Sequence, residues 1–162
     1  MQATEYFWVR VLPHEKHNID LLLKMEKILF LQDAVNLYTL VPLVAYQRAY
    51  LYQDRNGNSS GYALVMNHSQ SSDTAYLFSY GIMPQFQGIG LGTGGFKDLV
   101  HLLYGEGFAK MELTVSPSNT AALSIYRLLP VLEETLFPDH YGENQTRICL
   151  LLKLGNIFHN LS

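Results

Sequence analysis

The sequence feature that most restricts the fold is a glycine-rich segment, residues 88–95, in which five of the eight positions are glycine. An apolar run ending at Pro84 precedes it and apolar residues at helical spacing follow it, which places it between a strand and a helix. Glycine lets the backbone approach an anion closely, and the amides at a helix N-terminus then bind that anion. The segment is therefore predicted to hold a phosphate or pyrophosphate group, with a turn whose glycines only solve a steric problem as the alternative.

The same glycines also overlap two nucleotide-binding patterns. Residues 90–95 satisfy G-x-G-x-x-G, and Glu112 stands where a dinucleotide-binding fold would carry its ribose-binding acid. In that fold the motif follows its strand directly, whereas residues 84–87 intervene here. A P-loop is excluded because Lys97 is followed by Asp98 instead of Ser or Thr. An NAD-binding enzyme is thus an alternative that rests on the glycines alone.

The rest of the chain alternates between strand-like and helical patterns. Aromatic and β-branched runs bounded by turn residues predict strands at residues 6–12, 49–53, 62–66, 74–83, 110–115, 131–138 and 146–154. Helical spacing of apolar residues predicts helices after residue 18, over 88–107 and over 119–129. This order predicts one α+β domain over residues 1–162, built around a mixed sheet.

The first helical region has two features that bear on its ends. Asn18 is the predicted N-cap, because its side chain can accept a hydrogen bond from the first turn. Pro42 is expected to break the apolar stretch 28–46, giving either two helices or a helix and a loop. Polar residues interrupt this stretch, so it falls short of a membrane span.

Composition excludes several classes of protein. The net charge of −3 lacks the positive field of non-specific nucleic-acid binding, so no nucleic-acid partner is expected. The single cysteine, Cys149, cannot form an internal disulfide, and its apolar neighbours predict buried packing. His14 and His17 have no further ligands nearby, so no metal site is expected. Neither a secretory signal nor a membrane span is recognised, which favours the cytoplasm.

A second motif follows the strand predicted at residues 110–115. Asn119, Ala122 and Tyr126 fit the pattern N-x-x-A-x-x-x-Y at the start of a helix. With the pattern Q-x-x-G-x-G in the glycine loop, this motif makes residues 76–154 resemble the GNAT superfamily of N-acetyltransferases. The resemblance implies a mixed, mostly antiparallel central sheet of six to seven strands flanked by helices, and acetyl-CoA as the acyl donor.

The resemblance also implies which residues hold acetyl-CoA. The backbone of the preceding strand would pair with the pantetheine arm at Tyr80, Gly81 and Ile82. The backbone amides of the loop would hold the pyrophosphate, and the loop consists of Gln85, Phe86, Gln87, Gly88, Ile89 and Gly90. The cofactor site would thus be formed largely by main-chain groups.

The implied reaction is transfer of the acetyl group to a primary amine of a small molecule or peptide, by direct attack in a ternary complex. Asn119 and Ala122 would belong to the cofactor site, and Tyr126 would lie near the sulfur. A tyrosine phenol, with a pKa near 10, can protonate a leaving thiolate. Tyr126 is therefore the candidate catalytic residue, and a backbone amide near Ile82 is the candidate donor to the oxyanion.

The motifs leave the general base unassigned. Some members of the superfamily carry a glutamate early on the cofactor strand, but residues 76–79 contain none. Glu112 is a candidate base acting through a water, and His140 and Tyr141 are candidates for the acceptor mouth. The missing base keeps a non-catalytic acyl-CoA-binding module of the same fold as the alternative. A homodimer through the last strand and residues 155–162 is also left open.

The helix after the loop departs from the pattern of the superfamily. Thr93 and Gly94 stand where two leucines are usual. Each glycine inside a regular helix costs about 1 kcal/mol relative to alanine. Either a close contact requires these glycines or this end of the helix is mobile.

Overall fold

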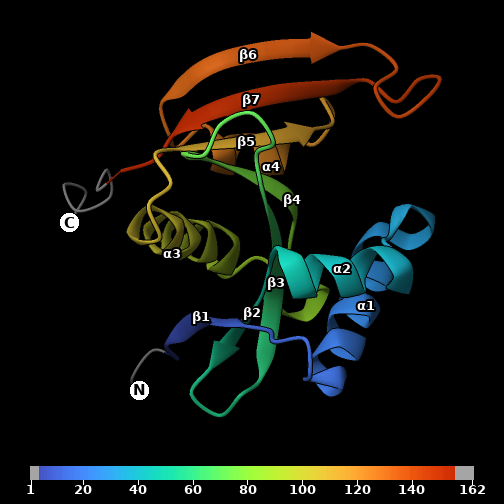
Figure 1. Ribbon diagram of the computed structural model, residues 1–162, viewed down its shortest axis with the longest axis vertical. Coiled ribbons are helices and arrows are strands. Elements are labelled where there is room, and N and C mark those ends of the chain that lie inside the picture. The colour runs from blue at the N-terminus through green and yellow to red at the C-terminus, as the bar shows by residue number, and fades with distance from the viewer. Residues whose placement is uncertain (1–3, 156–162) are drawn as a thin grey trace. The chain divides into compact units, whose positions relative to one another are not determined.

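The computed structural model describes residues 4–155, drawn in colour in Figure 1. These residues form seven strands, four α-helices and two short 3-10 helices. In chain order the elements are β1 (Tyr6–Arg10), α1 (Lys16–Phe30), η1 (Leu31–Asp33), α2 (Leu37–Tyr46), β2 (Arg48–Asp54), β3 (Ser59–Asn67), β4 (Thr74–Ile82), η2 (Pro84–Phe86), α3 (Leu91–Gly105), β5 (Lys110–Val115), α4 (Thr120–Tyr126), β6 (Val131–Phe137) and β7 (Arg147–Lys153). Every strand predicted from the sequence is present.

The strands form one sheet with the order β1-β2-β3-β4-β5-β7-β6. The pairs β1–β2, β2–β3, β5–β7 and β6–β7 are antiparallel, whereas β4 and β5 are parallel with α3 as the crossover between them. The expected α+β class with a mostly antiparallel sheet is confirmed. A doubly wound parallel sheet, which the dinucleotide-binding alternative needs, is not what these residues form.

Two compact units divide the described residues. The first contains the chain up to Met66 together with Ser79–Asp98, and the second contains Asn67–Phe78 together with the chain from Leu99 onward. Strand β4 and helix α3 therefore each contribute to both units. The expectation of one domain over residues 1–162 stays a prediction.

The first unit has a core of apolar side chains from α1, α2 and the strands β2 and β3. Apolar residues recur on α1 at helical spacing, and the inward faces of β2 and β3 carry aliphatic and aromatic side chains. The buried cluster consists of Val11, Ile19, Leu22, Met25, Leu40, Leu43, Val44, Ala49, Leu51, Tyr62, Leu64 and Met83. This packing fixes α1 against the strands that precede the glycine loop.

Helix α1 begins earlier than the sequence suggests. The prediction that Asn18 caps it is wrong, because α1 begins at Lys16 and its N-cap is Glu15. The Glu15 carboxyl group accepts hydrogen bonds from the backbone N–H of Leu12 at 2.6 Å and from Asn18 Nδ2 at 3.3 Å. Asn18 therefore supports the first turn from inside the helix.

Two helices do form in the apolar stretch 28–46, but Pro42 is not the break between them. Pro42 lies inside α2, and the chain turns earlier, where Leu31 has a φ of 52°. The side chain of Asn36 then starts α2 by accepting from the Thr39 N–H at 3.0 Å. The carbonyl that Pro42 leaves without its helical donor belongs to Tyr38, which is 92% exposed, so water can replace that donor.

The second unit shows strict alternation along β5. Met111, Leu113 and Val115 are buried, whereas Glu112 and Thr114 on the other face are half-buried. The same alternation continues on β7, where Leu150 and Leu152 are buried. One face of this part of the sheet therefore belongs to the core, and the other presents polar side chains.

The position of Cys149 corrects the expectation of buried packing. Cys149 is half-buried and pairs with Thr114 across β7 and β5, so its side chain shares the polar face of the sheet. Its apolar neighbours Leu150 and Leu152 point to the opposite face, which the run of apolar letters does not reveal.

Two further findings concern the exterior of the protein. No helix within residues 4–155 is long and apolar enough to cross a membrane. Strand β7 lies between β5 and β6, so both of its edges are already paired, and β6 is the edge strand on that side of the sheet. The tail at residues 156–162, named above for a dimer contact, lies outside the described residues.

Candidate cofactor and catalytic site

The glycine loop in the first unit has the backbone conformation that selects glycine. Gly88 and Gly90 have φ angles of 79° and 87°, in the region that side chains rarely adopt. A Cβ atom at either position would meet no atom within 4 Å, so conformation rather than lack of space requires glycine here. The loop residues 87–90 are exposed, and their main-chain groups are accessible to a ligand.

The loop is fixed to strand β4 on one side and to helix α3 on the other. Gln87 Nε2 donates to the carbonyl oxygen of Ile82 at 2.9 Å, which ties the loop back to the strand. The Gly94 N–H donates to the Gly90 carbonyl at 2.9 Å and closes the first turn of α3. The first N–H groups of a helix have no acceptor within the helix, and they carry its positive dipole end. This arrangement can bind an anion at the start of α3.

Aromatic side chains anchor the first turn of α3. The Tyr80 hydroxyl donates to the Gly92 carbonyl at 2.6 Å, and Trp8 Nε1 donates to the Gly95 carbonyl at 2.9 Å. The Trp8 ring also lies 4.6 Å from that of Tyr52, centroid to centroid. The side chain of Tyr80 is therefore structural, and only its main chain is available for the cofactor role that the resemblance implies.

The glycines inside α3 differ in what surrounds them. A Cβ atom at Gly95 would lie 3.0 Å from the Tyr80 hydroxyl and 3.1 Å from the Tyr52 ring, whereas one at Gly94 would meet nothing within 4 Å. The Tyr52 hydroxyl donates to Asp98 at 2.6 Å, so this ring is held in place. A close contact thus explains Gly95 but not Gly94.

Alanine substitutions are expected to separate these two glycines. Gly94→Ala should raise the free energy of unfolding by about 0.5–1 kcal/mol, because it removes only the helix cost of glycine. Gly95→Ala should lower it by about 1 kcal/mol, because overpacking against two anchored tyrosines exceeds that gain. Urea denaturation of both variants measures the difference, and equal shifts of the same sign would contradict the assignment.

Strand β4 is tightly packed just before the loop. A Cβ atom at Gly81 would lie 2.4 Å from Leu29 Cδ1, and one at Gly61 would lie 2.5 Å from the Gly81 carbonyl oxygen. The Met83 N–H donates to the Ser60 carbonyl at 2.8 Å. Strand β3 and helix α1 therefore fix the path of β4 along the segment predicted to pair with the pantetheine arm.

A buried carboxyl group that the sequence analysis missed completes this packing. Glu26 on α1 is 2% exposed. Its Oε1 accepts from the Tyr62 hydroxyl at 2.7 Å and from the Ser79 hydroxyl, and its Oε2 accepts from the Val35 N–H at 3.2 Å. The available signal was the position of Glu26 on the apolar stripe of α1, four residues after Leu22. Glu26 joins α1, the end of the α1–α2 connection, β3 and β4.

In the second unit, the motif on α4 has a clear structural part. Asn119 is the N-cap of α4, and its Oδ1 accepts from the Ala122 N–H at 3.2 Å. Tyr126 at the other end of α4 is 9% exposed. Burial raises the pKa of Tyr126 to about 12, so the phenol keeps its proton at neutral pH.

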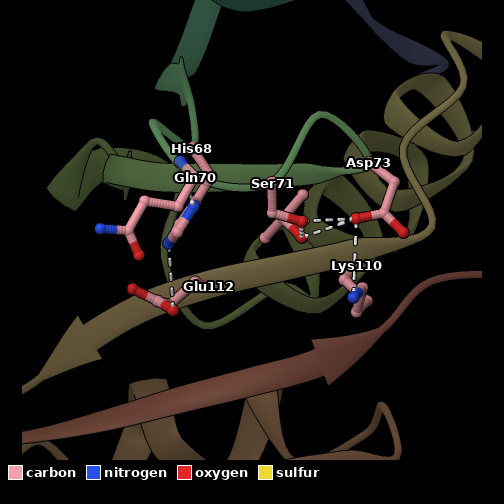
Figure 2. Close-up of polar contacts among 7 residues, drawn as sticks. His68, Gln70, Ser71, Asp73, Lys110 and Glu112 are labelled. Carbon is pink, nitrogen blue, oxygen red and sulfur yellow. Dashed lines mark hydrogen bonds and ion pairs between the residues drawn. The ribbon is translucent and has the colours of Figure 1, made fainter.

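The polar face of β5 brings further ionisable groups together. Glu112 Oε2 lies 3.7 Å from Nε2 of His68, a residue that the sequence analysis did not single out (Figure 2). Burial, followed by the charge and hydrogen bond of Glu112, raises the pKa of Cys149 to about 11. Cys149 is therefore a neutral thiol and not a thiolate nucleophile at neutral pH.

Aromatic side chains cluster around the connection between β6 and β7. The rings of Phe137 and His140 are 5.3 Å apart, those of His140 and Tyr141 are 4.7 Å apart, and the Arg147 guanidinium lies 5.2 Å from the Tyr141 ring. Burial is the largest cause that raises the pKa of Tyr76 to about 12, and Tyr141 contributes to the same shift. Of the two candidates for the acceptor mouth, Tyr141 therefore interacts with Tyr76, and His140 packs against Tyr141.

Each unit therefore carries one group of candidate residues. The first holds the strand and loop residues Tyr80, Gly81, Ile82, Gln85, Phe86, Gln87, Gly88, Ile89 and Gly90. The second holds Asn119, Ala122 and Tyr126, with Glu112, His140 and Tyr141. Arg127, the residue after α4, forms an ion pair with Glu134 at 2.8 Å. Residues 4–155 contain no group of three or more His, Cys, Asp or Glu side chains arranged for a metal ion.

Comparison with known proteins identifies the family. The profile of the Acetyltransferase (GNAT) family matches residues 21–129, which include the glycine loop and the α4 motif. The chain belongs to the GNAT family of acetyltransferases.

A curated relative is similar to this chain over part of its length. The [ribosomal protein bS18]-alanine N-acetyltransferase of Escherichia coli strain K12 is 31% identical over 93 residues, covering 57% of this chain and 61% of that protein. The chain spans between 54% and 61% of the length of the first curated relatives that it matches.

Solved structures share the fold over nearly the whole chain. The crystal structure of the ribosomal-protein-S18-alanine N-acetyltransferase from Escherichia coli has a TM-score of 0.77 at 21% identity, covering 93% of this chain and 95% of that one. Diaminobutyrate acetyltransferase from Paenibacillus lautus, in complex with L-2,4-diaminobutyric acid and coenzyme A, has a TM-score of 0.67 at 17% identity, covering 95% and 98%. These likenesses confirm the fold that the resemblance implied.

Proposed function

We propose that this protein is an acetyl-CoA-dependent N-acetyltransferase that transfers the acetyl group to a primary amine by direct attack in a ternary complex. The observation that carries the proposal is the loop with positive φ angles at Gly88 and Gly90, open to solvent at the start of α3, in a member of this family. Catalysed acyl transfer then needs a held thioester, a neutral amine and a proton for the leaving thiolate.

The loop fits the pyrophosphate of acetyl-CoA. Residues 85–90 would present backbone N–H groups to its negative charge, supported by the positive end of α3. The main chain of β4 would pair with the pantetheine arm at Tyr80 and Gly81. The Ile82 carbonyl already accepts a hydrogen bond from the Gln87 side chain. Bound there, acetyl-CoA supplies the acyl thioester. A solved relative in complex with coenzyme A supports this choice of acyl donor.

The α4 motif would serve the leaving group. Asn119 Oδ1 already accepts a hydrogen bond from the Ala122 N–H. The Nδ2 group is therefore the part of Asn119 that can donate a hydrogen bond to the cofactor. Tyr126 would donate its proton to the departing thiolate. The raised pKa keeps this proton in place until the thiolate forms.

The acceptor would be a primary amine of a peptide or of a small molecule. One relative is named for an alanine of a ribosomal protein, and a solved relative was bound to L-2,4-diaminobutyric acid. Both acceptors present a primary amine, which agrees with the direct-attack mechanism. A cytoplasmic location and a homodimer remain predictions, as does the absence of nucleic-acid and membrane partners.

A panel of amines tests the proposal. The protein is incubated with acetyl-CoA and either short peptides of varied N-terminal residue or diamino acids, and thiol release is followed together with the mass of the acetylated product. We expect amine-dependent thiol release with at least one class of acceptor. Acetyl-CoA binding without thiol release for any amine would favour the non-catalytic binding module instead.

A further inference from the structure

The start of helix α3 accepts hydrogen bonds from two aromatic side chains that have no part in the proposed reaction. Trp8 Nε1, on β1, donates to the Gly95 carbonyl at 2.9 Å. The Tyr80 hydroxyl, on β4, donates to the Gly92 carbonyl at 2.6 Å. The two acceptors are three residues apart, so they lie on one face of α3. Both donors and both acceptors belong to the first unit.

The glycine content of α3 explains why its start needs support from outside the helix. Gly92, Gly94 and Gly95 are three of its first five residues. Glycine costs about 1 kcal/mol relative to alanine inside a helix, and it has no side chain that could pack against the strands. Main-chain carbonyls are therefore the groups by which neighbouring strands can hold these glycines. Trp8 and Tyr80 bond two of these carbonyls.

The two donors act on one column of hydrogen bonds along α3. The Gly95 carbonyl, which accepts from the indole, belongs to the same peptide group as the Phe96 N–H. The helical pattern pairs that N–H with the Gly92 carbonyl, which also accepts from the phenol. The Gly92 carbonyl shares its peptide group with the Thr93 N–H. Thr93 precedes the first helical bond, so its N–H has no acceptor within the helix.

Hydrogen bonds in such a column strengthen one another. A donor on a carbonyl oxygen polarises the peptide group, and the N–H of that group becomes a better donor. The first N–H groups of a helix also carry its positive dipole end, which favours an anion. Trp8 and Tyr80 therefore hold the first turn of α3 and increase the donor strength of the Thr93 N–H.

Packing keeps the two donors in place. The Trp8 ring lies 4.6 Å from the Tyr52 ring and 6.1 Å from the Tyr80 ring, centroid to centroid. The Tyr80 ring lies 6.1 Å from that of Phe96, which is fully buried. The Tyr52 hydroxyl donates to the Asp98 carboxyl group at 2.6 Å and ties this aromatic cluster to α3 a second time. Groups held in this way lose little conformational freedom when a ligand binds.

We propose that Trp8 and Tyr80 are positioning residues for the pyrophosphate of acetyl-CoA and act through the main chain of α3. This inference rests on the proposed function. The two side chains bond the Gly95 and Gly92 carbonyls, keep the glycine-rich start of α3 helical and strengthen its N–H groups toward the anion. The bound anion in turn orders the turns that Trp8 contacts. Trp8 is the single tryptophan of the chain, so its fluorescence reports on this site.

Tyr80→Phe tests the proposal against a matched control. It removes the donor to the Gly92 carbonyl and keeps the ring. Calorimetry should find the acetyl-CoA Kd about tenfold higher, a change of about 1.4 kcal/mol. Tyr52→Phe removes a hydroxyl donor to the same helix, but its acceptor is the Asp98 side chain, outside the column. The acetyl-CoA Kd of this control should stay within about twofold of the original value.

Two kinetic measurements separate positioning from general loss of stability, with an amine that the unaltered protein acetylates. Tyr80→Phe should raise the KM for acetyl-CoA and keep kcat, because a contact to the pyrophosphate is the same in the ground state and the transition state. S-acetyl-pantetheine carries no pyrophosphate, so its kcat/KM should stay within about twofold in this variant. Urea denaturation confirms that the variants are folded.

Trp8 fluorescence provides a readout that does not depend on catalysis. Inorganic pyrophosphate should change the emission of the unaltered protein, because the anion and the indole act on the same column. Gly88→Glu should abolish the change, and Tyr80→Phe should move the midpoint to about tenfold higher pyrophosphate. Trp8→Phe should also raise the acetyl-CoA Kd; if this variant does not fold, Tyr80→Phe decides the matter.

Several results would overturn the proposal. It fails if Tyr80→Phe binds acetyl-CoA as tightly as the unaltered protein, or if Tyr52→Phe loses as much affinity. It also fails if Tyr80→Phe lowers kcat/KM for S-acetyl-pantetheine as much as for acetyl-CoA, because the hydroxyl would then act on the pantetheine arm. The expected binding effects without acetylation of any amine would refute the proposed function and leave the positioning role standing. Binding of neither acetyl-CoA nor pyrophosphate would refute both.

Discussion

Replacing Glu26 with alanine is expected to lower the free energy of unfolding by about 3 kcal/mol, through lost hydrogen bonds and a cavity in the core. The buried carboxyl group accepts hydrogen bonds from the Tyr62 and Ser79 hydroxyls and from the Val35 N–H. The two hydroxyls lie 3.1 Å apart and can bond each other, but the Val35 N–H loses its partner. Urea denaturation measures the change as a lower midpoint with the same slope.

The matched control for this substitution is Glu26→Gln. The glutamine amide can turn its oxygen to the Val35 N–H and donate from its nitrogen to the two hydroxyl oxygens, because hydroxyl groups rotate. The cost should therefore be about 1 kcal/mol, the net value of a typical hydrogen bond. Equal losses in the alanine and glutamine variants would contradict this, because they would show that the amide cannot replace the hydrogen bonds of the carboxyl group and that the volume lost with alanine costs nothing.

Tyr126→Phe is expected to lower kcat by about 100-fold or more while leaving acetyl-CoA affinity unchanged. The substitution removes the proton donor for the thiolate but keeps the buried ring that packs at the end of α4. The raised pKa of Tyr126 means that the rate of the unaltered protein should not fall through loss of this proton until the pH approaches about 12. Steady-state rates and calorimetry on the same preparation measure the two effects separately.

The control for this substitution is loss of a phenol elsewhere in the protein. Tyr104→Phe removes a phenol from an exposed position on α3, far along the helix from the glycine loop, and should leave kcat unchanged. If Tyr126→Phe weakens acetyl-CoA binding in proportion to its loss of rate, Tyr126 shapes the cofactor site and does not act as the proton donor.

The sequence was sufficient to predict the features that depend on local chemistry. The glycines of residues 88–95 predicted a turn between a strand and a helix, and Gly88 and Gly90 lie in that turn with positive φ angles. The pattern from Asn119 to Tyr126 predicted the start of a helix, and Asn119 is the N-cap of α4. These predictions rest on interactions between residues close in the chain, where spacing determines geometry.

The missed features depend on contacts between distant residues. The pairing of His68 with Glu112 requires the register of β4 against β5, which no local pattern encodes. Glu26 finds its partners on β3, on β4 and after α1, so only the packed unit shows why an acid lies on an apolar stripe. Pro42 was misread because its effect depends on whether water can reach the carbonyl four residues earlier.

The central claim is that the exposed glycine loop binds acetyl-CoA, and calorimetric titration tests it most directly. Gly88→Glu places bulk and negative charge where the pyrophosphate would lie. Gly57→Glu is the matched control, because Gly57 has a similar φ of 82° and equally open surroundings in the β2–β3 hairpin. NAD serves as the ligand control.

We expect micromolar binding of acetyl-CoA to the unaltered protein and to Gly57→Glu, no binding to Gly88→Glu, and no heat of binding with NAD. Absence of acetyl-CoA binding to the unaltered protein, or binding that survives in Gly88→Glu, would contradict it. The glycines would then serve only to turn the chain from β4 into α3.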